Sequence, residues 1–122
     1  MTAFASVSTI PAGGIRVDGD GTTFSGPAAS QARSVFSGAP LDGPISAALL
    51  FNGNLVIGNT SDPSGKNLLV EISSKGKLLD VLNVDKGAGG ALFGIAATGA
   101  SLDDTKLYFN DDNDNDLQVL EK

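Results

Sequence analysis

The stretch "NGNLVIGNTSDPSGKNLLVEISSKGKLLDVL", residues 52–82, decides the fold class. It contains three short apolar runs, at residues 55–58, 68–72 and 78–82, which we expect to be strands. Segments rich in Gly, Asn, Ser and Pro separate these runs, and such residues supply the backbone conformations of tight turns. The stretch therefore predicts an antiparallel meander in an all-β protein.

The chain repeats this pattern when it is slid along itself by roughly 46 to 52 positions. Three pairs of segments then coincide: "SVFSGAPLDGPISAALL" (34–50) with "DVLNVDKGAGGALFGIAA" (80–97), "NLVIGN" (54–59) with "KLYFND" (106–111), and "NLLVEI" (67–72) with "DLQVLE" (116–121). Each unit has a linker, an apolar inner strand and a meander. Four short strands at a period near ~45 residues are typical of a β-propeller blade rather than of a sandwich or a helical solenoid.

The second copy resembles the NHL-repeat family of six-bladed β-propellers. Gly-Ile-Ala at 94–96 matches the family's inner strand, Leu-Tyr-Phe at 107–109 its second strand, and the Asp/Asn-rich segment 111–115 its turn. Leu-Gln-Val-Leu at 117–120 matches the third strand, although it lacks the basic residue that many members carry. The first copy departs further, with Ser-Ala-Ala at 46–48 and a longer turn. The resemblance implies antiparallel four-stranded blades.

The resemblance covers about residues 35–122 and divides the chain into three parts. We expect a partial, degenerate first blade in residues 1–34, with a hairpin that turns at Asp-Gly-Asp-Gly, residues 18–21. A complete blade in residues 35–83 and a nearly complete last blade in residues 84–122 follow. Together they form a single propeller portion.

A stack of two or three blades leaves an apolar flank open at each end. We therefore expect a homo-oligomer, in which two chains close a six-bladed ring and an N-terminal strand of one chain pairs beside the last strand of the other. A trimer and a fragment of a longer propeller are the alternatives.

Composition excludes several kinds of chemistry. The chain has no Cys and no His, so thiolate and imidazole nucleophiles, bases and metal ligands are absent. Eight basic and fourteen acidic residues give a net charge of -6, which disfavours nucleic acid and anionic lipid as partners. No apolar run approaches the ~20 residues of a membrane span. The start "MTAFASVSTIPAGG" lacks the features of a signal peptide, while the overall composition slightly favours an exported bacterial protein.

The segment "LYFNDDNDNDLQVL", residues 107–120, contains a candidate calcium site. Asp112, Asp114 and Asp116 have the alternate spacing with which carboxylates converge on Ca²⁺. The segment has neither the glycine nor the final glutamate of a calcium-binding loop, and it continues directly into a strand. The alternative is an ordinary turn in which Asp and Asn accept backbone N–H bonds.

Three further segments have weaker claims to a site. Asp103 and Asp104 would join a calcium site only if their loop met the 112–116 segment, and otherwise form a solvated rim. The "VDGDGT" segment, 17–22, is half a calcium loop or a hairpin turn. The glycines of "KGAGGALFG", 86–94, indicate a linker between blades rather than a phosphate cradle, because no Lys-Ser/Thr pair or helix start follows.

These observations favour a non-catalytic binding or structural module whose loops meet a protein or a carbohydrate. One alternative is a metal-dependent lactonase or esterase of the six-bladed propeller type, whose site would need Glu, Asn and Asp around a cation. The chain has only Glu71 and Glu121, both in expected third strands away from the channel, which opposes an enzyme. A calcium-stabilised assembly unit is the other alternative.

Overall fold

The computed structural model describes residues 6–9, 16–17, 24–25, 33–60, 66–87 and 89–121. Within these ranges the regular secondary structure consists of strands, and neighbouring strands pair antiparallel. The prediction of an all-β, antiparallel protein is therefore confirmed. Among the same residues, no helix is long and apolar enough to cross a membrane.

The central sheet contains four strands in chain order, so that each strand pairs with the next. They are β5 (Pro44–Leu49), β6 (Leu55–Asn59), β7 (Asn67–Ile72) and β8 (Leu78–Asp85). This arrangement confirms the meander predicted for residues 52–82. The β8 strand continues past the boundary expected between residues 83 and 84, because its pairing with β7 extends to the Asn67–Asp85 partners.

The turn between β7 and β8 requires glycine at position 76. Gly76 has a φ of 84°, a conformation that L side chains rarely adopt. A Cβ atom there would also collide with the carbonyl oxygen of Val35 in the neighbouring strand β4 (Arg33–Ser37). This glycine therefore sets both the turn and its close approach to β4.

A second sheet contains β9 (Ile95–Thr98), β10 (Lys106–Asp111) and β11 (Asp116–Glu121), again in chain order. The β10 strand alternates strictly, since Leu107, Phe109 and Asp111 are buried while the residues between them are not. This period of two is expected of a strand with one face against a core. The glycine-containing segment 86–94 connects the two sheets, as predicted for a linker.

Burial supports the equivalence of "NLVIGN" and "KLYFND" that the sequence repeat predicts. Ile57 and Phe109 occupy matching positions and are 1% and 2% exposed. At the ends of the same strands, Asn59 and Asp111 are 0% and 2% exposed. Two polar side chains thus take the same buried position in the two sheets.

The third strands match with a shift of one residue. Superposing "NLLVEI" on "DLQVLE" by sequence places Val70 over Val119. In the structure, Val70 pairs with Ile57. Phe109, the counterpart of Ile57, pairs with Gln118, so the structural counterpart of Val70 is Gln118 and not Val119. The turns that precede the two third strands differ in length, and a shift of one residue moves every side chain to the opposite face of a strand.

The central sheet has a hydrophobic cluster on each face. One cluster fills the space against the second sheet and contains Ala48, Val56, Leu69, Ala91, Leu92, Leu107 and Phe109. The other contains Leu41, Ile57, Leu68, Val70 and Ile72, with Val35 and Phe36 of β4 packed against it. Burial on both faces explains why β7 has a continuous apolar run instead of an alternating one.

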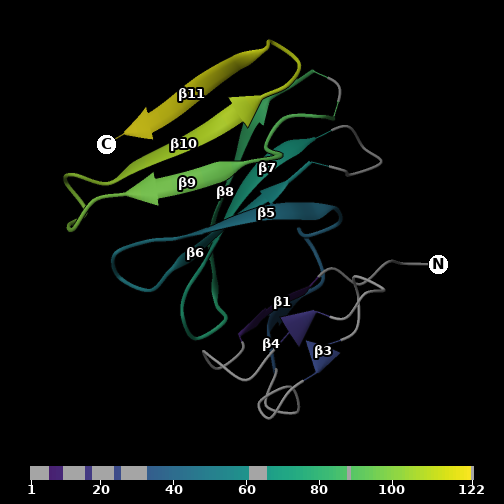
Figure 1. Cartoon of the computed structure of the whole chain (residues 1–122), viewed down its shortest axis with the longest axis vertical. Coiled ribbons are helices and arrows are strands. Elements are labelled where there is room, and N and C mark those ends of the chain that lie inside the picture. The colour runs from purple at the N-terminus through teal and green to yellow at the C-terminus, as the bar shows by residue number, and fades with distance from the viewer. Residues whose placement is uncertain are drawn as a thin grey trace.

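The N-terminal part contributes two pairs of short strands. The β1 strand (Ser6–Thr9) pairs with β4, and β2 (Arg16–Val17) pairs with β3 (Phe24–Ser25). The β2–β3 pair is the one that the expected hairpin requires, while its Asp-Gly turn at 18–21 lies outside the described residues. Figure 1 shows the sheets following one another along the long axis, with β9–β11 at one end and β1 and β4 at the other.

Candidate functional site

The acidic segment after β10 forms a compact turn. Residues 112–115 connect β10 to β11, and the Asp111–Asp116 partners close the hairpin. Asn115 has a φ of 55°, the left-handed conformation that Asn tolerates better than most residues. The buried Asp111 carboxylate accepts a 3.1 Å hydrogen bond from the backbone N–H of Asn113. These features are those of an Asx-stabilised turn.

The three aspartates of the predicted calcium site are exposed on this turn and at the start of β11. Among the described residues, no group of three or more acidic side chains lies close enough to hold a metal ion. Calcium binding by Asp112, Asp114 and Asp116 therefore remains a prediction that the geometry does not itself support.

Asp103 and Asp104 lie at the opposite end of β10 from the 112–116 turn. The strand between them has six residues and so spans roughly 20 Å. Asp104 accepts hydrogen bonds from the hydroxyl and the backbone N–H of Ser101 and from the N–H of Ala100, and these bonds lower its pKa. Because the two acidic loops are separated by the strand, they do not form one cation site.

Asp85, at the end of β8, joins the central sheet to the acidic turn. Its carboxylate accepts hydrogen bonds from the Asn113 side chain and from the Gly87 N–H. The bond from Asn113 is the main cause of a lowered Asp85 pKa, and the bond from Gly87 adds to it. The turn that was a candidate calcium loop thus contacts the neighbouring sheet through an amide.

The fully buried Asn67 organises the linker between the sheets. Its Oδ1 accepts hydrogen bonds from the Gly90 and Ala91 N–H groups, at 3.2 and 3.1 Å, and from the Thr60 hydroxyl. Its Nδ2 donates to the Asp85 carbonyl oxygen at 3.0 Å. One side chain therefore ties the ends of β6, β7 and β8 to the segment that leads into β9.

A glycine–asparagine hydrogen bond with the same sequence separation occurs in each sheet, although Asn110 is one residue before Asp111, which is the counterpart of Asn59 in the sequence repeat. The N–H of Gly43, before β5, donates to Oδ1 of Asn59, at the end of β6. The N–H of Gly94, before β9, donates in the same way to Oδ1 of Asn110 in β10. Each pair is separated by 16 residues. Sequence reasoning did not single out these asparagines, although the repeated spacing of Gly and Asn was available as a signal.

The face of the β9–β11 sheet that points away from the central sheet has an open, apolar centre, with the Lys106–Glu121 salt bridge at one end of the strands and Asn110 at the other. Because Leu107 and Phe109 point to the core, Tyr108 between them points to the other side. Its cross-strand partners are Ala96 and Val119, and Leu117 lies nearby on the same face of β11. Leu117 is 71% exposed and Val119 46%. We call Ala96, Tyr108, Leu117 and Val119 the open face.

The two glutamates occupy the third strands, as predicted. Glu71 in β7 accepts a 2.9 Å hydrogen bond from the Asn54 side chain. Glu121 in β11 forms a 3.3 Å salt bridge with Lys106. They belong to different sheets and have different partners, an arrangement that provides no shared carboxylate site for hydrolysis.

Comparisons with known proteins give no relative. No protein-family model matches the chain, and no curated protein or solved structure matches it either. The NHL-repeat resemblance thus rests on the motifs themselves.

Proposed function

We propose that the protein is a non-catalytic binding and assembly module of the β-propeller type. In this proposal the β5–β8 and β9–β11 sheets are successive blades, and β1 and β4 belong to the blade before them. Three observations support it: the sheets follow each other in chain order, their first strands β5 and β9 lie against one another, and the matching residues Ile57 and Phe109 are both buried. Repeated sheets that bury their faces against their neighbours are the general design of such folds.

We further propose that the open face is the surface through which the chain self-associates. The single observation that carries this proposal is the exposure of Leu117 and Val119 beside Tyr108. In the central sheet the face that corresponds to it, which includes Val56 and Leu69, is buried by the following sheet. A second copy of the chain would cover the open face in the same manner, and two chains would supply the blades of a six-bladed ring.

Sedimentation velocity over a wide concentration range tests this proposal. The wild type should form a dimer or a larger oligomer, and the double variant Leu117→Thr/Val119→Thr should remain monomeric. Full burial of a Leu or Val side chain contributes about 1.5–3 kcal/mol, so the double variant should weaken association by well over tenfold. Threonine preserves the β-propensity of the strand.

The matched control is Leu49→Thr/Leu79→Thr, which changes two side chains of similar exposure, 66% and 45%, in the central sheet. It should associate like the wild type. A wild-type chain that stays monomeric at high micromolar concentration, or a control that dissociates as readily as the open-face variant, contradicts the proposal. A partner search with immobilised glycans and proteins then addresses the ligand.

A further inference from the structure

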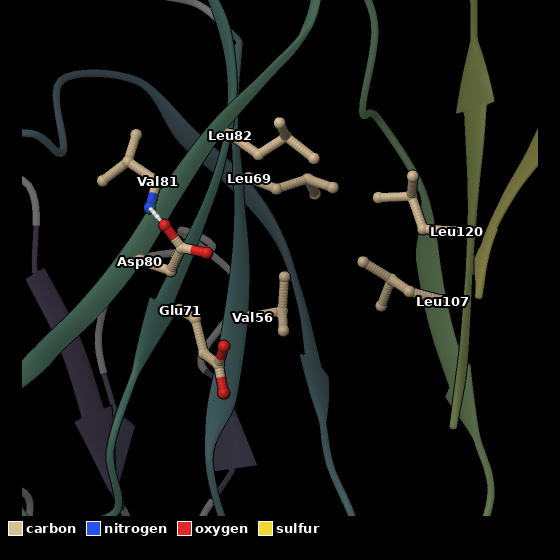
Figure 2. Close-up of a pocket in the computed structure, with 8 residues that line it drawn as sticks. All are labelled: Val56, Leu69, Glu71, Asp80, Val81, Leu82, Leu107 and Leu120. Atoms are coloured by element: carbon tan, nitrogen blue, oxygen red, sulfur yellow. Dashed lines mark hydrogen bonds between the residues drawn. The ribbon is translucent and has the colours of Figure 1, made fainter. Parts of the chain in front are cut away.

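An apolar cleft of about 140 Å³ lies between the central sheet and the β9–β11 sheet. Figure 2 shows Val56, Leu69 and Leu82 on one wall, pointing across the cleft toward Leu107 and Leu120 on the other. The cleft lies on the side of the two sheets where the third and fourth strands are, away from the contact between β5 and β9.

One wall of this cleft also has two carboxylates. Glu71 and Asp80 are cross-strand partners in β7 and β8, so both side chains point to the same face as Leu69 and Leu82. Like charges placed directly opposite each other in a sheet are destabilising. The ion pair recorded in the described part of the chain joins Lys106 to Glu121, and it does not involve this acidic pair.

The hydrogen bonds of the two carboxylates leave acceptor capacity for a ligand. Glu71 accepts one bond, from the Asn54 side chain, and Asp80 accepts one from the Val81 N–H. A carboxylate has two oxygens and about four lone-pair sites. The pair therefore offers several acceptors next to an aliphatic surface, which suits a ligand with a cationic donor head and an apolar tail.

The volume of the cleft indicates the size of tail that it can hold. A buried cavity of ~150 Å³ lined by aliphatic and aromatic side chains accommodates benzene, which has about six heavy atoms. The cleft has a similar volume, about 140 Å³, and is open to solvent at Leu82 and Leu120, so it has room for at least a short unbranched chain. A primary ammonium group brings three donors and no acceptor, which complements two carboxylates.

We propose that this cleft is a binding site for a small primary alkylammonium ion. The aliphatic chain lies among Leu69, Leu82 and Leu107, and the ammonium group donates to Glu71 and Asp80. The site is separate from the open face, so it does not depend on the proposed self-association.

Titration with n-pentylammonium chloride, followed by methyl NMR of the full chain, tests this site. The methyl signals of Leu107 and Leu120 should shift with saturation. The uncharged 1-pentanol should bind at least about tenfold more weakly, because it lacks the positive charge that the two carboxylates attract and has one donor instead of three. Equal binding of the amine and the alcohol, or no binding of the amine, overturns the proposal.

The variant Glu71→Gln/Asp80→Asn should lower the affinity for pentylammonium about tenfold while leaving the pentanol affinity unchanged. Its glutamine keeps an oxygen for the Asn54 bond. The control Asp112→Asn/Asp114→Asn changes the net charge equally at the exposed turn and should bind like the wild type. Equal losses in the two variants would reduce the effect to overall charge and overturn the site.

Two further binding measurements test whether something other than a free amine occupies the cleft. If a lysine-containing peptide binds and the free amine does not, the occupant is a side chain of a partner protein, and the proposal is overturned. Binding that appears only in Lys122→Gln would overturn the proposal, because the wild-type cleft would then not be open to a free amine.

Discussion

Replacing Asn67 by alanine tests how the two sheets are held together. The Asn67 side chain is fully buried, and its two polar atoms connect three strand ends to the linker that precedes β9. Alanine keeps the backbone pairing of β7 but removes all of these side-chain bonds. The neighbouring polar groups would then be left inside the protein without this partner.

The size of the effect follows from which groups lose their partner. The Ala91 N–H depends on Asn67, whereas the Gly90 N–H also donates to the Thr60 hydroxyl at 2.9 Å. A buried donor left unsatisfied costs about 1–3 kcal/mol. With smaller losses at the Asp85 carbonyl and the Thr60 hydroxyl, the free energy of unfolding should fall by about 2–4 kcal/mol.

Urea unfolding of Asn67→Ala measures this loss. For a chain of this size the midpoint should fall by roughly 1–3 M, with an unchanged slope. The control Asn52→Ala removes an exposed asparagine whose Oδ1 accepts a single local bond from the Asn54 N–H, and it should cost less than about 1 kcal/mol. An Asn67→Ala protein within about 1 kcal/mol of the wild type would refute the reasoning about the linker.

Three other measurements test the core, the charges and the calcium hypothesis. Phe109→Ala opens a cavity between the sheets at a side chain that is 2% exposed, and urea unfolding should show a loss of about 3–5 kcal/mol, with Phe109→Leu losing much less. Because the pKa of Asp85 is lowered in the folded protein, its carboxylate stabilises the fold at pH values above its ordinary pKa of 3.8. This contribution should disappear as the pH falls through the lowered pKa of the folded state. Unfolding midpoints measured on both sides of this range should therefore fall less steeply with acid in Asp85→Asn than in the wild type. If the 112–116 turn binds calcium, millimolar Ca²⁺ raises the Tm relative to chelator, and Asp112→Asn/Asp114→Asn abolishes the difference; an unchanged Tm removes the hypothesis.

Much of the fold could be predicted because the strands are short, apolar and separated by turn residues. The meander of residues 52–82 follows from local composition alone, and the repeat correctly matched Ile57 with Phe109. Pairing between strands was harder to predict, because the parity of a strand depends on the turn before it. The sequence repeat wrongly matched Val70 with Val119, whereas the strand pairing matches it with Gln118.

The candidate site was predicted less well because its residues are distant in sequence. The acidic residues 103–116 look continuous along the chain, yet β10 separates them into two groups. The cleft acids, Glu71 and Asp80, are not adjacent in the sequence and have no motif, and only the β7–β8 register places them opposite each other. Likewise, Asn67 is an ordinary strand-end asparagine until the linker folds back onto it.

The sequence of β11 does not show the alternation expected of a strand with one face in water. An antiparallel sheet with one face in water alternates apolar and polar residues. In β11, Leu117, Val119 and Glu121 point outward while Asp116, Gln118 and Leu120 point inward, so the outward face is at least as apolar as the inward one. The β7 strand, which is buried on both faces by the rest of the chain, has the same character. The residues of β11 therefore suit a strand between two layers, and in the proposed assembly the sheets of a second copy of the chain would supply the missing layer.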